Sequence, residues 1–315
     1  MVGYSLGMQS DNQLDQLVDE ITRRVQARLV QEVPSQPPVS GSACKPGESC
    51  EGCGGCAVKR PDDVRQIVRM GVTRIGATAG HGRPASDLAP LIDHTLLKAD
   101  ADRAQLKKLC DEARQYGFAT VCVNSVNVRY CASQLEGAVT KAIAVVGFPL
   151  GAETSNAKAF ETREAVRNGA AEIDMVINLG ALKSRDYATV LEDIVAVVGA
   201  AHPKPVKVII EAGMLDHDQK VIACALSKVA GAAFVKTSTG FGVGGATVED
   251  IALMRSVVGP QMGVKASGGI HSEEDARRLV AAGATRLGAS ASVAIVTGAT
   301  DSKKKKGKLR AVGGY

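Results

Sequence analysis

Eight short apolar segments, rich in β-branched residues, recur from residue 88 onward and alternate with amphipathic helical patterns. Apolar strands joined by helices are typical of a parallel sheet covered on both faces. Eight such units in about 210 residues predict a (β/α)₈ TIM barrel over residues 88–298. An open doubly wound sheet is the alternative, but it would need a glycine fingerprint after its first strand, where the chain reads HTLLKAD. The expected strands are residues 91–95, 119–124, 142–147, 172–177, 206–211, 234–238, 262–267 and 285–290.

The composition agrees with layered packing of small side chains, because 45% of residues are hydrophobic, only 3% are aromatic and tryptophan is absent. No apolar run approaches the roughly 20 residues that a membrane-spanning helix needs. The first residues, MVGYSLGMQSDNQ, have neither the charged nor the apolar region of a secretory signal. We therefore expect a cytoplasmic protein that does not enter a membrane.

The net charge of +5 comes from the C-terminal tail, residues 299–315. Without its six basic residues, 32 basic residues face 33 acidic ones, so the rest of the chain is near neutral. We expect a solvated tail and no nucleic-acid-binding face. The six residues are Lys303, Lys304, Lys305, Lys306, Lys308 and Arg310.

The N-terminal segment, residues 1–32, contains a helical pattern over residues 11–31. The linker that follows, residues 33–60, begins with a stretch rich in Pro, Ser and Gly, which isolates the helix from the barrel. The apolar stripe is therefore expected to meet another molecule. Docking on the barrel and self-association are the alternatives. The stripe consists of Leu14, Leu17, Val18, Ile21, Val25 and Leu29.

The linker ends in a cysteine cluster with the spacing C-x₅-C-x₂-C-x₂-C, formed by Cys44, Cys50, Cys53 and Cys56. This spacing is compatible with zinc or an iron–sulfur cluster, although the second C-x₂-C pair of a zinc ribbon is missing. Redox-sensitive or incidental cysteines are the alternatives, and no disulfide framework is expected in a cytosolic protein of this size.

The segment 61–87 carries an internal similarity, because residues 63–78 match residues 275–290 at eight of sixteen positions. Each copy has the pattern of a helix, a glycine stop and a short strand. A partial duplication and convergence of helix–strand patterning both account for it, and the pattern assigns the first copy no role.

Charged residues interrupt the apolar strands, which is costly unless the charges are paired or functional. Asp93, Lys236 and Lys265 are expected at the ends of strands one, six and seven, and Asp174 lies within strand four. Active sites of such barrels lie at the carboxyl ends of the strands. We therefore expect these side chains, and Cys122 of strand two, to meet there.

The residue types predict covalent chemistry. A lysine is a nucleophile only when neutral, and burial and a nearby ammonium both lower its pKa. Because strands six and seven are neighbours, Lys265 is expected to lower the pKa of Lys236. A neutral Lys236 would form a Schiff base with a carbonyl, without a cofactor or catalytic metal, and Asp174 and Lys265 are the candidate proton shuttles.

Glycine and serine loops follow the last three expected strands, at TSTGFGVGG (237–245), SGGIHS (267–272) and GASAS (288–292). Backbone N–H groups in such loops bind phosphate, and barrels often place phosphate near strands seven and eight. The loops predict an anion site beside the two lysines.

Seven motifs are distributed over the whole barrel: LIDHTLLK (91–98), VCVNS (121–125), GFPLG (147–151), EIDMVIN (172–178), KVIIEAG (207–213), FVKTSTGF (234–241) and VKASGGI (264–270). Together they give the barrel a close resemblance to the deoxyribose-phosphate aldolase family of Schiff-base aldolases. The resemblance implies reversible cleavage of 2-deoxy-D-ribose 5-phosphate to D-glyceraldehyde 3-phosphate and acetaldehyde.

By this resemblance Lys236 is the Schiff-base lysine, Asp174 and Lys265 form the proton relay, and Asp93 is a hydrogen-bonding aspartate. Cys122 matches a cysteine that lies near the substrate in some members, and Tyr315 matches a C-terminal tyrosine that enters the site in some. The phosphate loops correspond to Gly240, Gly268, Gly269 and Ser290, although Ala291 replaces the second serine of a pair present in some members.

The N-terminal segment resembles the encapsulation peptides of bacterial microcompartment enzymes, which predicts shell or cargo proteins as partners of residues 11–31 and the compartment lumen as a location. We also expect a homo-oligomer acting on a sugar phosphate and an aldehyde. A Schiff-base aldolase of another sugar phosphate and a non-catalytic microcompartment scaffold are the alternative functions.

Overall fold

The computed structural model describes residues 86–298 as a closed barrel of eight parallel strands, which confirms the predicted (β/α)₈ TIM barrel. The strands are adjacent in chain order, and the last strand closes the barrel by pairing with the first. Each predicted strand segment contains or overlaps an observed strand. The strands are β1 (Ile92–Leu96), β2 (Thr120–Asn124), β3 (Lys141–Val146), β4 (Ile173–Val176), β5 (Val206–Ile209), β6 (Phe234–Lys236), β7 (Gly263–Ser267) and β8 (Arg286–Ala289).

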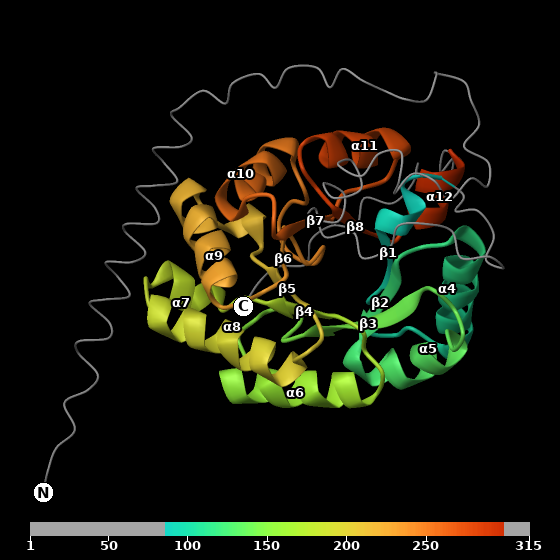
Figure 1. Cartoon of the computed structure of the whole chain (residues 1–315), viewed down its shortest axis with the longest axis horizontal. Helices are drawn as coiled ribbons and strands as arrows, with labels where there is room; N and C mark the ends of the chain where they lie inside the picture. The colour runs from blue at the N-terminus through green and yellow to red at the C-terminus, as the bar shows by residue number, and fades with distance from the viewer. Residues whose placement is uncertain (1–85, 299–315) are drawn as a thin grey trace, which may run out of the picture.

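The helices form a ring outside the strands (Figure 1). They are α4 (Arg103–Tyr116), α5 (Val128–Gln134), α6 (Ser155–Arg167), α7 (Leu179–Lys183), α8 (Tyr187–Ala201), α9 (His217–Val229), α10 (Val248–Val258), α11 (Glu273–Ala281) and α12 (Ser292–Thr297). Local sequence sets their ends. For example, the Asp102 side chain accepts a hydrogen bond from the Gln105 N–H at the start of α4, and Gly117 ends that helix with a φ of 72°.

Alternation along the strands separates an apolar layer from a polar interior. The main hydrophobic core, between strands and helices, includes Ile173 and Met175 of β4 but not Asp174 between them. Because successive side chains of a strand point to opposite faces, Asp174 points into the barrel. The same alternation places Lys265, between Val264 and Ala266 of the core, on the inner face of β7.

A buried ion pair joins α6 to α8 beneath the end of β4. Lys158 Nζ lies 2.6 Å from an oxygen of Asp193 and donates a second hydrogen bond of 3.0 Å to the Val176 carbonyl. Both side chains are almost fully buried, so each charge depends on the other.

Lys158→Met is therefore expected to lower the free energy of unfolding by about 3–5 kcal/mol, because it leaves the Asp193 carboxyl buried without its cation. Urea unfolding checks this value. The double variant Lys158→Met/Asp193→Leu should recover much of the loss, and Lys107→Met, which breaks the exposed pair with Asp111, should change little. Equal losses in the single and double variants would contradict the explanation.

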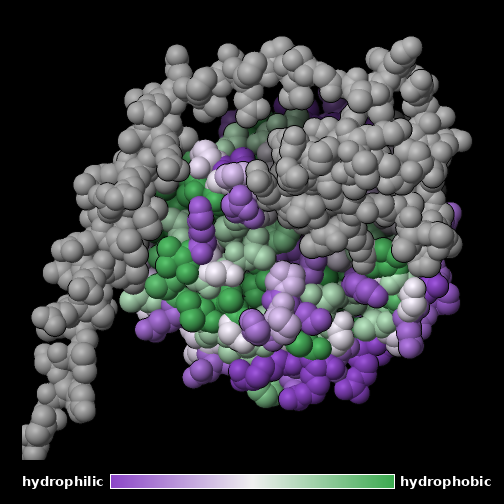
Figure 2. All heavy atoms as spheres, viewed as in Figure 1, coloured by the Kyte–Doolittle hydropathy of each residue, from purple (hydrophilic) through white to green (hydrophobic). Residues whose placement is uncertain are grey.

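The visible outer surface is polar where α6 forms the edge of the molecule, as Figure 2 shows. Within residues 86–298, none of the helices has the length and hydropathy required to cross a membrane. Four predictions fall outside this part of the chain: the helix at 11–31, the cysteine cluster, the repeat copy at 63–78, and the tail with Tyr315.

Candidate active site

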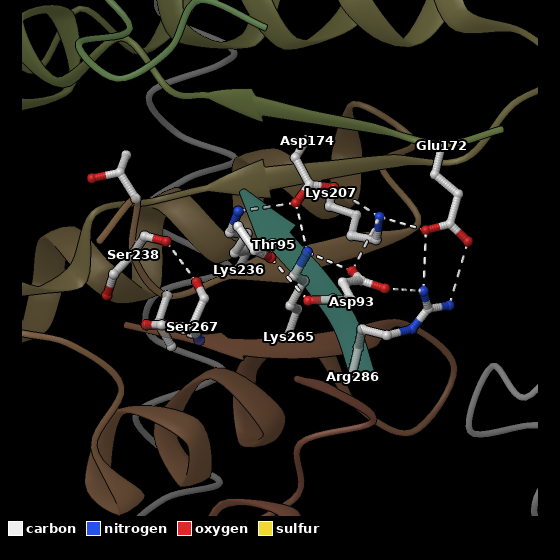
Figure 3. Close-up of polar contacts among 12 residues, drawn as sticks. Asp93, Thr95, Glu172, Asp174, Lys207, Lys236, Ser238, Lys265, Ser267 and Arg286 are labelled. Carbon is white, nitrogen blue, oxygen red and sulfur yellow. Dashed lines mark hydrogen bonds and ion pairs between the residues drawn. The ribbon is translucent and has the colours of Figure 1, made fainter. Parts of the chain in front are cut away.

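Lys236 is the last residue of β6, as predicted, and its Cα pairs with that of Lys265 on the adjacent strand β7. Both side chains are buried, and both point into the barrel (Figure 3). The structure therefore brings together the two lysines that the sequence singled out.

The expectation that Asp93 and Lys265 end their strands is wrong. Asp93 is the second residue of β1, and Lys265 is the third of five in β7. The strands of a closed barrel are staggered, so residues at different positions along their strands can reach the same level of the interior. Long lysine side chains extend this reach further, and the charged groups meet although not every Cα lies at a strand end.

Asp174 is the centre of the arrangement (Figure 3). Its Oδ2 accepts hydrogen bonds from Lys236 Nζ at 2.9 Å and from Lys265 Nζ at 2.7 Å. Its Oδ1 accepts one from Lys207 Nζ at 2.7 Å. One buried carboxylate thus contacts three lysines from three strands.

Asp93 forms a second centre on the other side of Lys265. Its Oδ2 lies 2.5 Å from Lys265 Nζ, and its Oδ1 accepts hydrogen bonds of 2.7 Å from both Arg286 and the Thr120 hydroxyl. The Oε2 atom of Glu172 lies 2.5 Å from Lys207 Nζ and 3.2 Å from Arg286 Nη1, so Glu172 connects the two centres. We call this set the charge cluster; it comprises Asp93, Glu172, Asp174, Lys207, Lys236, Lys265 and Arg286.

Sequence reasoning missed three members of the charge cluster. Lys207 lies within the apolar stretch VKVII (206–210), so the argument that drew attention to Asp174 applies to it equally. Glu172 directly precedes β4 and Arg286 begins β8. Polar residues are ordinary at the start of a strand, so the sequence gives no comparable signal for these two.

The charges of the cluster balance when Lys236 is neutral. Three carboxylates, Asp93, Glu172 and Asp174, then face three cations, Lys207, Lys265 and Arg286. A fourth cation would leave one uncompensated charge in a buried site, which is costly. The network therefore favours the neutral amine of Lys236.

The pKa of Lys236 is lowered in agreement with this balance. Burial is the largest cause; Asp174 opposes it by attracting the ammonium form, and the Lys265 ammonium lowers the pKa further. The predicted influence of Lys265 on Lys236 is thus present in the geometry, but it is second to desolvation.

Lys265 behaves in the opposite way. Burial disfavours its charge, but the carboxylates of Asp174 and Asp93 outweigh burial and raise its pKa. The pKa of Asp174 is held well below its usual range, because the three lysines together overcome the effect of burial. Gly288 of β8 leaves space for this arrangement, since a Cβ there would lie 3.0 Å from Lys265 Cε.

Cys122 of β2 is also on the inner face, in a small cluster with Leu97, Ile143 and Val145. Burial raises the pKa of its thiol to about 11, and the Asp174 carboxylate adds to this rise. At neutral pH the thiol is therefore protonated, and it is a poor nucleophile.

The glycine loops after β6 and β7 meet. A Cβ atom added to Gly268 would lie 3.7 Å from the Cα of Gly240. A Cβ atom added to Gly245 would lie only 2.5 Å from the carbonyl oxygen of Gly268 and would clash with it. Gly240, Gly268 and Gly269 have positive φ values of 83°, 84° and 77°, which favour glycine. No hydrogen bond to another residue within 86–298 engages their N–H groups.

Ser290, predicted to belong to the same anion site, directly follows β8 and is exposed. Its side chain makes no hydrogen bond with other residues of the described barrel. The structure thus brings the glycines of two predicted loops together but gives Ser290 no contact that ties it to them.

Comparison with known proteins adds independent observations. A sequence profile described as DeoC/LacD family aldolase matches residues 88–301. The chain is 59% identical over 212 residues to the deoxyribose-phosphate aldolase of Clostridium perfringens (strain SM101 / Type A), covering 67% of this chain and 95% of that protein. It is 61% identical over 207 residues to the deoxyribose-phosphate aldolase of Streptococcus pneumoniae serotype 19F (strain G54), covering 66% of this chain and 94% of that protein.

Among solved structures, the fold is similar to that of the deoxyribose phosphate aldolase from Aeropyrum pernix, which is described as having a unique tetrameric structure. The TM-score is 0.64 and the sequence identity 34%, and the match covers 74% of this chain and 96% of that one.

Proposed function

The chain belongs to the DeoC/LacD family of aldolases, and from this premise we propose that it cleaves 2-deoxy-D-ribose 5-phosphate reversibly to D-glyceraldehyde 3-phosphate and acetaldehyde. The observation that carries the proposal is the buried contact of Lys236 and Lys265 with one oxygen of Asp174. In that contact an amine whose pKa is lowered lies beside one whose pKa is raised, which supports imine chemistry on Lys236.

The proposed first step is attack of the Lys236 amine on the C1 aldehyde of the open-chain sugar. The C–N bond forms, the carbonyl oxygen is protonated, and loss of one water gives a protonated Schiff base. Removal of the proton from the C3 hydroxyl then breaks the C2–C3 bond, and the electron pair enters the iminium to form an enamine. Glyceraldehyde 3-phosphate leaves; protonation at C2 and addition of one water release acetaldehyde and regenerate Lys236.

The proton transfers are assigned to Asp174 and Lys265. The low pKa of Asp174 makes it a weak base, so it would pass a proton between its lysine neighbours and the substrate instead of holding one. Lys265, whose pKa is raised, would supply the proton that oxygen needs during dehydration. Asp93 would keep Lys265 charged and in place at 2.5 Å, and the neutral thiol of Cys122 would form part of the substrate-facing wall.

The phosphate is assigned to the loops after β6, β7 and β8, through the N–H groups of Gly240, Gly268 and Gly269, with Ser290 as a further candidate. The support is the contact between the first two loops and the absence of partners for the three glycine N–H groups within residues 86–298. Such unpaired N–H groups in glycine loops suit an anion.

Borohydride reduction in the presence of acetaldehyde tests the mechanism. The wild-type protein should acquire an N-ethyl group, and peptide mass mapping should place it on Lys236, because among the lysines of residues 86–298 this is the one whose pKa is lowered. Modification of other lysines with none on Lys236 would refute the Schiff-base assignment. Turnover of deoxyribose phosphate compared with longer sugar phosphates then separates the proposed substrate from that of a related aldolase.

For the N-terminal segment we propose docking of residues 11–31 on a microcompartment shell or cargo protein, inside a cytoplasmic compartment. The support is the apolar stripe and the linker in the sequence, together with an aldehyde product whose reactivity makes confinement sensible. A variant that lacks residues 1–40 should fail to co-purify with shells; retention would refute the proposal. We also propose a homo-oligomer, which light scattering can measure.

A further inference from the structure

Glu211 is the second residue after the end of β5, and its backbone conformation is uncommon for a residue other than glycine. Its φ is 52°, in the left-handed region, and its side chain belongs to a residue that is only 3% exposed. Strained conformations of non-glycine residues cluster at functional sites, where surrounding contacts hold them. The contacts of Glu211 therefore indicate what the conformation serves.

The Glu211 carboxyl group is bonded to the loop after β6. Its two oxygens accept from the Thr239 N–H at 3.4 and 3.2 Å, and Oε2 also accepts from the Thr239 hydroxyl at 2.5 Å. The Thr239 hydroxyl in turn accepts from the Phe241 N–H at 3.1 Å. Within residues 86–298 no lysine, arginine or histidine forms an ion pair with Glu211, so the loop supplies its hydrogen-bond partners.

The same carboxyl group fits against the backbone of Gly242. A Cβ on Gly242 would lie 3.0–3.3 Å from the carboxyl atoms of Glu211, so the loop packs directly on them. Hydrogen bonds from Ile210 and Ala212 to the carbonyls of Lys236 and Thr237 fasten the start of the loop at the same place. Glu211 thus fixes residues 239–242, where Gly240 faces Gly268 of the neighbouring loop.

We propose that Glu211 is a positioning residue that holds the loop 237–245 in its anion-binding shape and so sets the affinity for the phosphate end of the substrate. This inference rests on the proposed function. The residue acts through Thr239 and Gly240, not by touching the phosphate, and it leaves the covalent chemistry of Lys236 unaffected.

The direction in which phosphate affinity changes when Glu211 is replaced distinguishes a positioning role from charge repulsion. A carboxylate near a bound phosphate would repel it, so loss of the charge alone would tighten binding. If Glu211 shapes the loop, its removal weakens binding instead, because the glycine N–H groups no longer converge. The two explanations predict KM changes in opposite directions.

The experiment compares the full-length wild-type protein with Glu211→Ala, Glu211→Gln and Thr239→Val. For 2-deoxyribose 5-phosphate, Glu211→Ala should raise KM on the order of tenfold or more with little change in kcat, as expected when uniform binding is lost. The inhibition constant of inorganic phosphate should rise in parallel. Glu211→Gln, which keeps one carbonyl acceptor, should rescue part of the effect, and Thr239→Val should reproduce most of it.

Unphosphorylated 2-deoxyribose and acetaldehyde trapping are the controls. The KM for unphosphorylated 2-deoxyribose and the yield of acetaldehyde trapping should be nearly unchanged in the variants. Because only the KM for the phosphorylated sugar rises, the preference for that sugar over the unphosphorylated one falls. An unchanged or lower KM for the phosphorylated sugar, or equal losses on both sugars, would overturn the inference. If Glu211→Ala does not fold, Glu211→Gln and Thr239→Val decide by the same criteria. Failure of the wild-type protein to trap acetaldehyde on Lys236 would instead overturn the proposed function.

Discussion

Lys236→Ala is expected to reduce turnover of 2-deoxyribose 5-phosphate by a factor on the order of 10⁴ or more, because no other lysine amine in the described barrel has a lowered pKa. The barrel should remain folded. Asp174 keeps its contacts with Lys207 and Lys265, so the variant leaves no carboxylate without a cation. Coupled-enzyme kinetics measure the loss, and circular dichroism checks the fold.

Lys183→Ala is the matched control, since Lys183 is an exposed lysine in α7 and forms no part of the charge cluster. It should retain full activity. Borohydride trapping with acetaldehyde should label Lys183→Ala as it labels the wild-type protein and should leave Lys236→Ala unlabelled. Substantial turnover by Lys236→Ala would mean that the nucleophile lies elsewhere.

Lys265→Met is expected to lower kcat/KM by about 10²–10⁴-fold, the range typical for removal of a general acid or base. It should also shift the pH profile. Burial and then the Lys265 ammonium lower the pKa of Lys236, while Asp174 raises it. Removing Lys265 leaves the effect of Asp174 less opposed, so the pKa of Lys236 rises. At a given pH less of the amine is neutral, and the acidic limb of the profile moves to higher pH.

Two further variants separate proximity from net charge. Lys265→Arg keeps a cation and should move the acidic limb least. Lys207→Met removes the same charge from the cluster, but Lys207 contacts the other oxygen of Asp174, so its shift should be smaller than that of Lys265→Met. A Lys265→Met profile that falls uniformly, with no displacement along the pH axis, would contradict the assigned influence on Lys236.

The strands were predictable because each is an apolar run between helical patterns, and closing eight of them in order leaves little choice of neighbour. That order makes β6 and β7 neighbours, and the register of the two strands pairs Lys236 with Lys265. The level of the Asp93 side chain along the barrel axis was not predictable, since it depends on the stagger of the strands in the closed barrel. Neither was the partner of Arg286, because Glu172 lies 114 positions away in the sequence and only barrel closure joins them.

The role of Glu211 was hidden for a different reason. A glutamate after a strand is an ordinary loop residue by composition, and glutamate is not among the residue types that signal a positive φ. The cysteine at position 122 shows the reverse case. Its place in β2 was predictable, but its protonation depends on burial among Leu97 and Ile143, which only the folded barrel provides.

The number of carboxylate contacts that each lysine makes has a consequence for its freedom to move during the reaction. Both oxygens of Asp174 are held, and Lys207 and Lys265 each bridge at least two carboxylates, so these groups have little conformational freedom left to lose. Within the described barrel the amine of Lys236 makes its side-chain hydrogen bond to Asp174 alone. Asp174, Lys207 and Lys265 are therefore held in place by several contacts each. Lys236 has the fewest contacts, and it is the side chain that must stay bonded to the reacting carbon from attack through release.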